Sequence, residues 1–184
     1  MRVISGSHKG RSLESVPGSV TRPTSDKIKE SVFQVMGPFF EGGLCLDLFA
    51  GSGALGIEAL SRGVSNALFV DAYPKAIRTI HNNMRKLKLD DRTEIFRTDA
   101  FRALNAIAKR DLQFDLILLD PPYQKVNYEK LLDRISSLQL LKPNGFLYCE
   151  HDASKLLSGQ VNHLATMKQE TYNGTTGVTI FQGN

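Results

Sequence analysis

The sequence predicts an α/β fold built on one mostly parallel sheet that ends in an antiparallel strand pair. From Leu44 onward, short apolar runs alternate with longer helix-like segments, the pattern of successive strand–helix units. The first of these runs leads into a glycine-rich turn. The end of the chain instead carries two long alternating segments, residues 161–172 and 174–182. Between them stands Asn173-Gly174, a strong hairpin signal, so these segments should form the antiparallel pair.

The length and composition favour a single domain over residues 1–184, with a basic extension (1–24) and a core (25–184). A chain of 184 residues with 41% hydrophobic residues can bury one sizeable core. No stretch approaches the roughly 20 apolar residues of a membrane span, and no apolar signal core follows the first basic residues. We expect a cytoplasmic protein, a monomer, with no membrane contact. Cys45 and Cys149 lack metal-ligand spacing, which favours buried free thiols and no metal site.

The first part of the chain predicts a small hairpin and then a helix. Residues 2–5 and 11–16 could pair around 6–10, and Pro17-Gly18 and Arg22-Pro23 then interrupt regular structure. A helix should follow at 26–36, capped by Ser25 or Thr24. The 3.6-residue period divides its side chains into a buried set and an outer set. The buried set is Ile28, Val32, Val35 and Met36, and the outer set is Lys27, Lys29 and Glu30.

The core should contain five parallel, mostly buried strands separated by helices. Strands are expected at 44–48, 67–71, 93–97, 114–120 and 145–150, and helices at 54–62, 74–88, 100–109 and 128–137. Pro74 suits a first helical turn. In that helix, apolar residues recur at three- and four-residue spacing, which gives one buried face. Its cations should mostly face water, namely Arg78, Arg85, Lys86 and Lys88.

A glycine-rich turn follows the first core strand and predicts a nucleotide-type cofactor. Residues 51–56 read G-x-G-x-x-G, and Asp71 ends the next strand about two dozen residues after Asp47. Glycines let the backbone approach a ligand, and an acid at that strand end can accept from both hydroxyls of a ribose. A turn without a ligand would leave this combination unexplained. The cofactor-binding residues predicted in the turn are Phe49, Ala50, Gly51, Ser52 and Gly53.

Two further acids decide which cofactor is favoured. Asp47, before the glycines, would repel a pyrophosphate but could pair with a cationic amino-acid group, directly or through water. S-adenosylmethionine carries such a group, so we predict it as the cofactor. Asp99 could accept from the adenine amine, although an acid at this place alone favours a helix cap. Ala72 and Ala100 would border the adenine and complete the predicted cofactor set.

The run Asp120-Pro121-Pro122-Tyr123 is the predicted catalytic element. Consecutive prolines have fixed φ and no N–H, so the carbonyls of Asp120 and Pro121 remain available as acceptors. An amine on an aromatic ring could donate to the Asp120 carboxylate and to the Pro121 carbonyl while Tyr123 stacks on the ring. Asp120 would therefore border both cofactor and substrate. A loop that only ends a strand is the competing interpretation.

The net charge of +4 lies entirely in the first 29 residues, which hold six Lys or Arg residues and two acids. A segment with the whole excess could contact a polyanion, most commonly nucleic acid. A solvated basic surface without a partner would have the same composition. The cations assigned to nucleic-acid contact are Lys9, Arg11, Arg22, Lys27 and Lys29.

In order and spacing, Asp47-Leu-Phe-Ala-Gly-Ser-Gly, Asp71, Asp99 and Asp120-Pro-Pro-Tyr resemble the seven-stranded class I methyltransferases that modify exocyclic amines. Three further segments resemble the RsmD family of 16S ribosomal RNA guanine-N2 methyltransferases: RVISGSHKGRSL (2–13), RPTSDKIKESVF (22–33) and GSGALGIEALSRG (51–63). The resemblance implies a Rossmann-like, seven-stranded fold and methyl transfer from S-adenosylmethionine to a guanine N2. The implied partner is 16S ribosomal RNA or the assembling small subunit, gripped by the basic head. Ser5 stands where the family usually has a second glycine, Lys27 and Lys29 stand where arginines are common, and the segment after His151 matches least.

Other functions remain open. A DNA or RNA adenine-N6 methyltransferase can use the same Asp-Pro-Pro-Tyr element, but 72–119 has no insertion that could read a DNA sequence. Protein glutamine methyltransferases usually carry Asn in place of Asp120. An NAD-dependent oxidoreductase would explain only the glycines. A noncatalytic RNA-binding module would not need three acids at strand ends. The sequence also leaves open the roles of His8, as an RNA contact, and His151.

Overall fold

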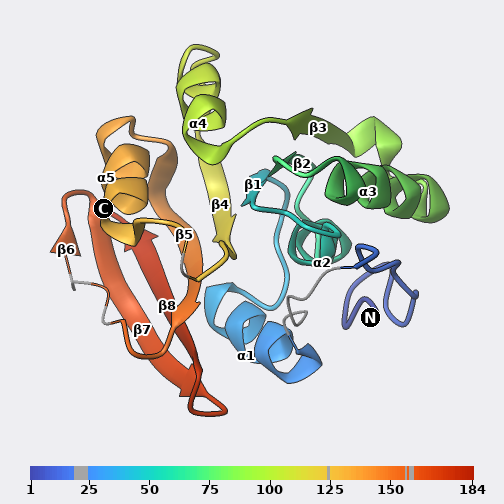
Figure 1. The fold of residues 1–184 in the computed structure, drawn as a ribbon, viewed down its shortest axis with the longest axis horizontal. Coiled ribbons are helices and arrows are strands. Elements are labelled where there is room, and N and C mark those ends of the chain that lie inside the picture. The colour runs from blue at the N-terminus through green and yellow to red at the C-terminus, as the bar shows by residue number, and fades with distance from the viewer. Residues whose placement is uncertain (19–24, 124, 156, 158–159) are drawn as a thin grey trace.

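The computed structural model describes residues 1–18, 25–123, 125–155, 157 and 160–184. It contains one mixed sheet of eight strands in the order β3-β2-β1-β4-β5-β8-β7-β6 (Figure 1). The predicted seven-stranded sheet with an antiparallel C-terminal pair is confirmed, and the two-residue β6 adds an eighth strand at the edge. The strands are β1 Leu44–Leu48, β2 Asn66–Asp71, β3 Thr93–Arg97, β4 Phe114–Leu119, β5 Leu141–Asp152, β6 Gln160–Val161, β7 Leu164–Tyr172 and β8 Thr176–Gly183.

The first five strands are parallel, and β1 lies at their centre. It pairs with β2 on one side and β4 on the other, so Leu48 lies opposite both Val70 and Leu119. Parallel strands in this register end at the same edge of the sheet. The three segments that follow β1, β2 and β4 therefore meet at that carboxyl edge, where open α/β sheets bind ligands.

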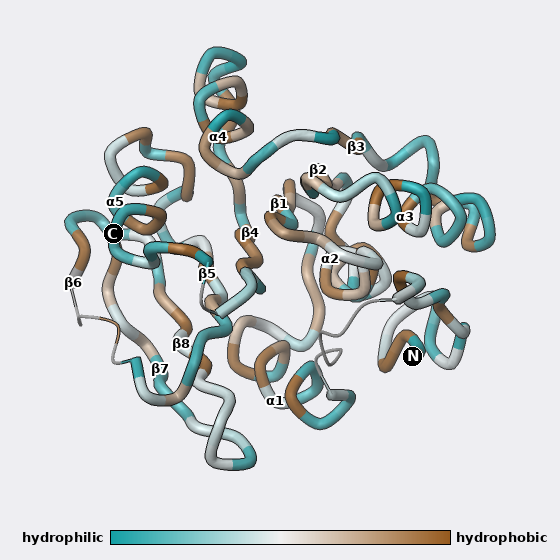
Figure 2. The backbone as a smooth tube through the Cα atoms, viewed as in Figure 1, coloured by the Kyte–Doolittle hydropathy of each residue, from teal (hydrophilic) through white to brown (hydrophobic). Residues whose placement is uncertain are grey.

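Helices cover both faces of the sheet, and each face has its own buried apolar cluster. Helices α1, α2 and α3 pack on one face with the N-terminal segment, and α4 and α5 on the other. The central strands are mainly apolar, whereas much of α3 is hydrophilic (Figure 2). The elements are α1 Asp26–Met36, α2 Ala54–Ser61, α3 Pro74–Leu87, the 3-10 turn η1 Asp90–Arg92, α4 Ala100–Ala108 and α5 Tyr128–Ser137.

Most predicted element ends agree with these bounds to within one residue. The largest difference is β5, which begins at Leu141 rather than at residue 145. Helix α1 begins as expected, because the Ser25 side chain accepts a hydrogen bond from the Ile28 N–H. The alternative cap, Thr24, lies outside the described residues. In the C-terminal hairpin, Asn173 and Gly174 both have positive φ, 52° and 70°, which matches a type I′ turn.

The predicted N-terminal hairpin is present in reduced form. One antiparallel bridge joins Arg2 to Ser12, and the Val3 N–H donates to the Arg11 carbonyl at 2.9 Å. The hairpin is instead fastened to the helices beneath it. A Cβ added to Gly6 would lie 1.9 Å from the Ser61 carbonyl oxygen, so only glycine allows the approach to the end of α2.

Two predictions for Lys29 are wrong. The sequence analysis placed its side chain on the outer face of the helix and assigned it to nucleic-acid contact. Its side chain is fully buried, and its Nζ donates to the Arg2 carbonyl at 2.8 Å. The Nζ also lies 4.0 Å from the buried carboxylate of Glu58. Burial lowers the pKa of Lys29, while Glu58 opposes that shift. Lys29 therefore ties α1 to the N-terminal segment and is closed to RNA.

Glu58 joins α2 to the N-terminal segment and to Lys29. Its carboxylate accepts from the backbone N–H groups of Ile4 and Ser5 at 2.9 and 3.0 Å. It also accepts from Arg62 Nε, one turn further along α2, at 2.8 Å. Among the residues that the structure describes, the donors to this buried carboxylate are thus charged side chains and backbone N–H groups. Such a group stabilises a fold only while all of its partners are present.

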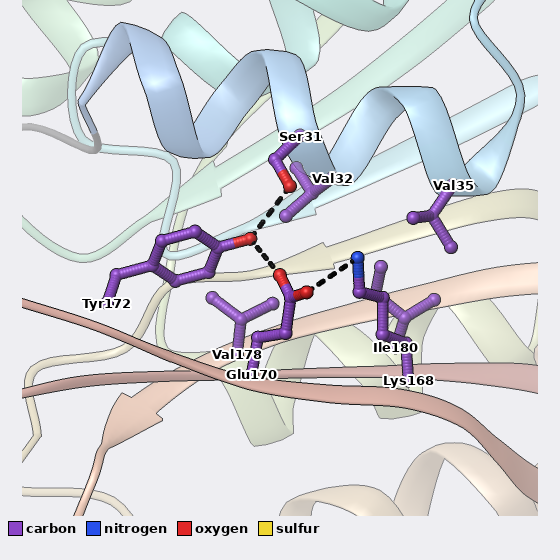
Figure 3. Close-up of a pocket in the computed structure, with 8 residues that line it drawn as sticks. All are labelled: Ser31, Val32, Val35, Lys168, Glu170, Tyr172, Val178 and Ile180. Atoms are coloured by element: carbon purple, nitrogen blue, oxygen red, sulfur yellow. Dashed lines mark hydrogen bonds and ion pairs between the residues drawn. The ribbon is translucent and has the colours of Figure 1, made fainter.

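A small pocket lies where α1 crosses β7 and β8 (Figure 3). Ser31 Oγ and the Tyr172 hydroxyl are 2.8 Å apart, Tyr172 donates to Glu170, and Lys168 Nζ lies 2.8 Å from the other Glu170 oxygen. Val35, predicted to be buried, lines this pocket and is only partly buried. The pocket is therefore a polar seam that fixes α1 to the C-terminal hairpin.

Glu58→Ala should lower the free energy of unfolding by about 3–5 kcal/mol, because it strands the buried charges of Lys29 and Arg62. Urea unfolding monitored by circular dichroism would measure the loss. Glu129→Ala, at an exposed position of α5, is the matched control and should change stability by less than about 0.5 kcal/mol. A Glu58→Ala protein as stable as the control would show that the buried cluster is not stabilising.

Candidate active site at the carboxyl edge of the sheet

The loop between β1 and α2 has an unusual backbone. Phe49, Gly51 and Gly53 have φ of 66°, 57° and 83°. Positive φ is strained for phenylalanine, and strain of this kind is characteristic of functional loops. The Ala50 N–H donates to the Val70 carbonyl at 3.0 Å, which fixes the loop to β2. A Cβ added to Gly51 would meet no protein atom within 4 Å, so the loop faces open space at this point.

Gly56, the third glycine of the motif, has a packing role. A Cβ at this position would lie 2.4 Å from the Phe69 ring and 3.0 Å from Asp47 Oδ2. Its N–H donates to that same Asp47 oxygen at 2.9 Å. Glycine therefore allows α2 to pack closely on the sheet while its backbone holds the Asp47 carboxylate.

Asp47 is buried within β1, with 1% of its surface exposed. Burial raises its pKa to about 7, the Gly56 N–H opposes that rise, and the charge of Asp71 adds to it. A buried carboxylate with a raised pKa favours a cation next to it. Asp47 is thus suited to the role predicted for it, pairing with the amino group of a cofactor.

Asp71 links the two loops that follow β1 and β2. One carboxylate oxygen accepts from the Gly51 N–H at 2.8 Å and the other from the Tyr73 N–H at 2.9 Å. Asp71 is 8% exposed. Each carboxylate oxygen can accept a second hydrogen bond, so both could still accept from a ribose. Ala72, the next residue, is exposed at the same edge.

Asp99 acts as the helix cap that the sequence analysis weighed against adenine binding. It accepts from the Arg102 N–H at 3.0 Å, and its carboxylate lies 3.3 Å from Arg102 Nε. Its side chain is about half exposed, and Ala100 after it is buried. A cap can still accept from another donor, so the adenine contact stays a prediction. Phe101 beside them is 39% exposed, an aromatic surface that the sequence analysis did not single out.

The Asp120-Pro121-Pro122-Tyr123 segment begins directly after β4. Pro121 is buried, while Asp120, Pro122 and Tyr123 are partly buried. Because Leu119 and Leu48 are paired, this segment lies beside the glycine loop. The predicted catalytic and cofactor segments are therefore neighbours at the edge of the sheet.

Glu150, near the end of β5, holds the aromatic part of this segment. Its two carboxylate oxygens accept from the hydroxyls of Tyr123 at 2.6 Å and of Tyr148 at 2.8 Å. Glu150 is 5% exposed. Burial, and then the bond to Glu150, raise the pKa of Tyr123, so its hydroxyl remains a donor. The sequence analysis missed Glu150, although its position at a strand end next to β4 was a usable signal.

The residues predicted to bind nucleic acid are dispersed. Lys9 and Arg11 are exposed on the N-terminal hairpin, Lys27 is exposed on α1, Lys29 is buried, and Arg22 lies outside the described residues. The hairpin tip contacts Ser61 at the end of α2, and His8 Nε2 lies 3.2 Å from the Leu87 carbonyl at the end of α3. The tip is therefore at the opposite end of these helices from the glycine loop.

The histidines left open have structural contacts. His8 Nδ1 lies 2.9 Å from Ser7 Oγ, in addition to its contact with Leu87. His151 is buried, with Nε2 2.9 Å from Thr179 Oγ1 and its ring edge-on to Tyr128. Cys45 and Cys149 are buried free thiols, as predicted. The described part of the chain has no group of three metal-ligating side chains and no helix long and apolar enough to cross a membrane.

Comparisons with known proteins agree with this architecture. The family model described as "Conserved hypothetical protein 95" matches residues 1–182. "Putative rRNA methyltransferase YlbH" of Bacillus subtilis is 52% identical over 182 residues, 99% of this chain and 98% of its own. "Ribosomal RNA small subunit methyltransferase D" of Haemophilus influenzae is 30% identical over 183 residues, 99% and 93% of the two chains.

Solved structures give the same result for the fold. The crystal structure of a "putative methylase" from Haemophilus influenzae superposes with a TM-score of 0.81 at 28% identity, covering 99% of this chain and 97% of its own. The match thus includes the N-terminal hairpin as well as the sheet. The chain belongs to the Conserved hypothetical protein 95 family, and its fold is that of the class I, S-adenosylmethionine-dependent methyltransferases.

Proposed function

We propose that this protein transfers the methyl group of S-adenosylmethionine to the exocyclic N2 amine of a guanine in 16S ribosomal RNA. The observation that carries the proposal is the pairing of β1 with β4, which sets Asp120-Pro-Pro-Tyr beside the glycine loop and its buried acids. The names of the relatives support ribosomal RNA as the substrate class. The hydrogen-bonding pattern of the catalytic segment supports a planar amine as the acceptor.

The acids at the edge of the sheet fit the three polar parts of the cofactor. Asp47 would take the ammonium of its methionine part, and Asp71 would accept from the ribose hydroxyls. Asp99 would accept from the adenine amine, with Ala72 and Ala100 at the ring. The open space at Gly51 allows a ligand close to the loop backbone. When bound, the cofactor supplies an electrophilic methyl group on a sulfonium that leaves as a neutral thioether.

Asp120 and Pro121 would orient the acceptor. An amine that donates one hydrogen to the Asp120 carboxylate and one to the Pro121 carbonyl becomes more pyramidal, with its lone pair aimed at the methyl group. Methyl transfer would leave positive charge on the nitrogen, which would lie against the Asp120 carboxylate. That carboxylate would stabilise the charge and would accept the proton that the nitrogen loses.

Tyr123 would stack on the guanine after the base has been taken out of any helix or stack. Extruding a base costs a few kcal/mol, so a rigid aromatic surface favours the extruded state. Glu150 supplies that rigidity, because its carboxylate fixes the hydroxyl end of the Tyr123 ring. Glu150 is therefore a positioning residue that acts through Tyr123.

The substrate assignment is tested with labelled S-adenosylmethionine and four acceptors: undermethylated small-subunit particles, naked 16S ribosomal RNA, duplex DNA and a protein extract. Nucleoside analysis of the labelled product should find N2-methylguanine from ribosomal RNA. Label in N6-methyladenine or in protein would contradict the proposed substrate while leaving the fold unaffected.

The affinity for S-adenosylmethionine should depend on pH through Asp47. A cationic partner lowers the pKa of Asp47 from its value of about 7 in the free protein, so binding favours the ionised carboxylate and releases a proton below pH 7. Affinity should fall by up to about tenfold per pH unit below pH 7 and level off above it. Calorimetry from pH 5.5 to 8.5 measures this, and Asp47→Asn should abolish the dependence. A pH-independent affinity in the wild type would remove Asp47 from the ammonium site.

Tyr123→Phe should lower kcat by about tenfold with unchanged cofactor affinity, because the ring remains but loses its bond to Glu150. Tyr123→Ala should lower kcat further, since the stacking surface is gone. Steady-state kinetics with ribosomal RNA would measure both. Tyr172→Phe is the matched control, because its hydroxyl also donates to a carboxylate but lies in the seam under α1. Equal kcat values for the two Phe variants would mean that Glu150 does not position Tyr123.

A further inference from the structure

Helix α3 carries an uncompensated positive charge. Its sequence, PKAIRTIHNNMRKL, has four Lys or Arg residues and no acid. Ile80, Met84 and Leu87 are buried on the side that packs against the sheet. All four cations are exposed, as is Lys88 at the C-cap: Lys75, Arg78, Arg85, Lys86 and Lys88. The net charge of residues 30–184 is zero, because acids elsewhere in that range balance the cations of α3. The net charge alone therefore does not reveal this local excess.

These cations follow one face of the helix. Arg78, His81 and Arg85 recur at three- and four-residue spacing, and Lys88 continues the same line. Within the described residues, none of the five cations has a carboxylate within 4.0 Å. The Arg85 guanidinium donates to Asn82 Oδ1 at 2.8 Å, so it is held by a neutral group. The nearby acid Glu14 accepts from Asn82 at 3.1 Å, and Asp90 and Asp91 lie beyond the helix in η1.

The helix dipole explains only half of this pattern. Cations are stabilised in the last turn of a helix, where Arg85 and Lys86 lie. Lys75 lies in the first turn and Arg78 close behind it, where the dipole disfavours positive charge. A row of cations along the full length of α3 is therefore better explained by an external anion that also extends along the helix.

The two ends of the row lie at the proposed cofactor site and at the N-terminal hairpin. Helix α3 starts three residues after Asp71, at the carboxyl edge of the sheet. Its last turn meets the hairpin, where Arg11 donates to the Lys86 carbonyl at 3.4 Å and Lys86 Nζ donates to Ser12 Oγ at 2.9 Å. Arg11 thus extends the row. Fourteen residues of helix span about 21 Å.

We propose that the exposed face of α3, continued by Arg11, is a track for the phosphate backbone of the RNA that flanks the target guanine. This inference rests on the proposed function and names the surface that would hold the substrate. The track begins beside the cofactor acids and leads away from them. It would hold the RNA while the target base is brought to Asp120.

The test compares variants of the full-length protein for binding to naked 16S ribosomal RNA over a range of salt concentrations. Arg78→Gln/Arg85→Gln should weaken binding at least tenfold near 100 mM salt and reduce the salt slope by about 1.5, since two phosphate contacts are lost. Arg78→Lys/Arg85→Lys keeps the charges and should retain most of the affinity. Lys109→Gln/Arg110→Gln removes the same charge at the end of α4, on the opposite face of the sheet, and should have little effect.

The melting temperature and the affinity for S-adenosylmethionine should be unchanged in all variants. A change in RNA binding can then be attributed to lost RNA contacts and not to misfolding. A salt slope equal to that of the wild type in Arg78→Gln/Arg85→Gln overturns the track, as does wild-type protein that does not bind RNA. Failure of the proposed function would appear differently, as salt-dependent RNA binding along α3 without N2-methylguanine in the product.

Discussion

The pairing of β1 with β4 is the constraint on which the site depends. In the register that sets Leu48 opposite Leu119, both strands end together, and the chain leaves one into the glycine loop and the other into Asp120-Pro-Pro-Tyr. A shift of one residue would turn every side chain of one strand to the other face, so the buried apolar residues of β1 and β4 enforce the register. Hydrophobic burial in the centre of the sheet thereby fixes the glycine loop beside the Asp120-Pro-Pro-Tyr segment.

Buried carboxylates then hold the loops that this register brings together. Asp71 joins the loops after β1 and β2, Glu150 holds Tyr123, and Glu58 fastens the N-terminal segment to α2. Each accepts from backbone N–H groups or hydroxyls, which offsets part of the cost of removing a charge from water. Asp47 differs, because burial raises its pKa to about 7 and the Gly56 N–H opposes that rise only in part, which suits the proposed pairing with a cofactor ammonium.

Much of this could be predicted from the sequence, because glycine spacing, strand-end acids and apolar runs are local signals. The hairpin at Asn173-Gly174 followed from a signal of the same kind. The prediction for Lys29 was wrong because helical spacing identifies only the face of α1 that packs on the sheet. Lys29 lies on another face, which the N-terminal segment covers, and there its Nζ donates to the Arg2 carbonyl. Glu150 was missed for a related reason, and so was the lack of acidic neighbours around the α3 cations, although most of those cations were expected to face water. Their significance depends on which residues lie beside them in space, and charge totals average that information away.

The central claim is that Asp120 aligns the acceptor amine, and the most direct measurement is the single-turnover rate of methyl transfer by Asp120→Asn with cofactor and ribosomal RNA bound. The substitution keeps the size of the side chain but places an N–H₂ donor against the amine. The account predicts a rate at least about a hundredfold below wild type, with both affinities unchanged within about threefold. A single-turnover rate within a few-fold of wild type would contradict it and would leave alignment to the backbone carbonyls alone.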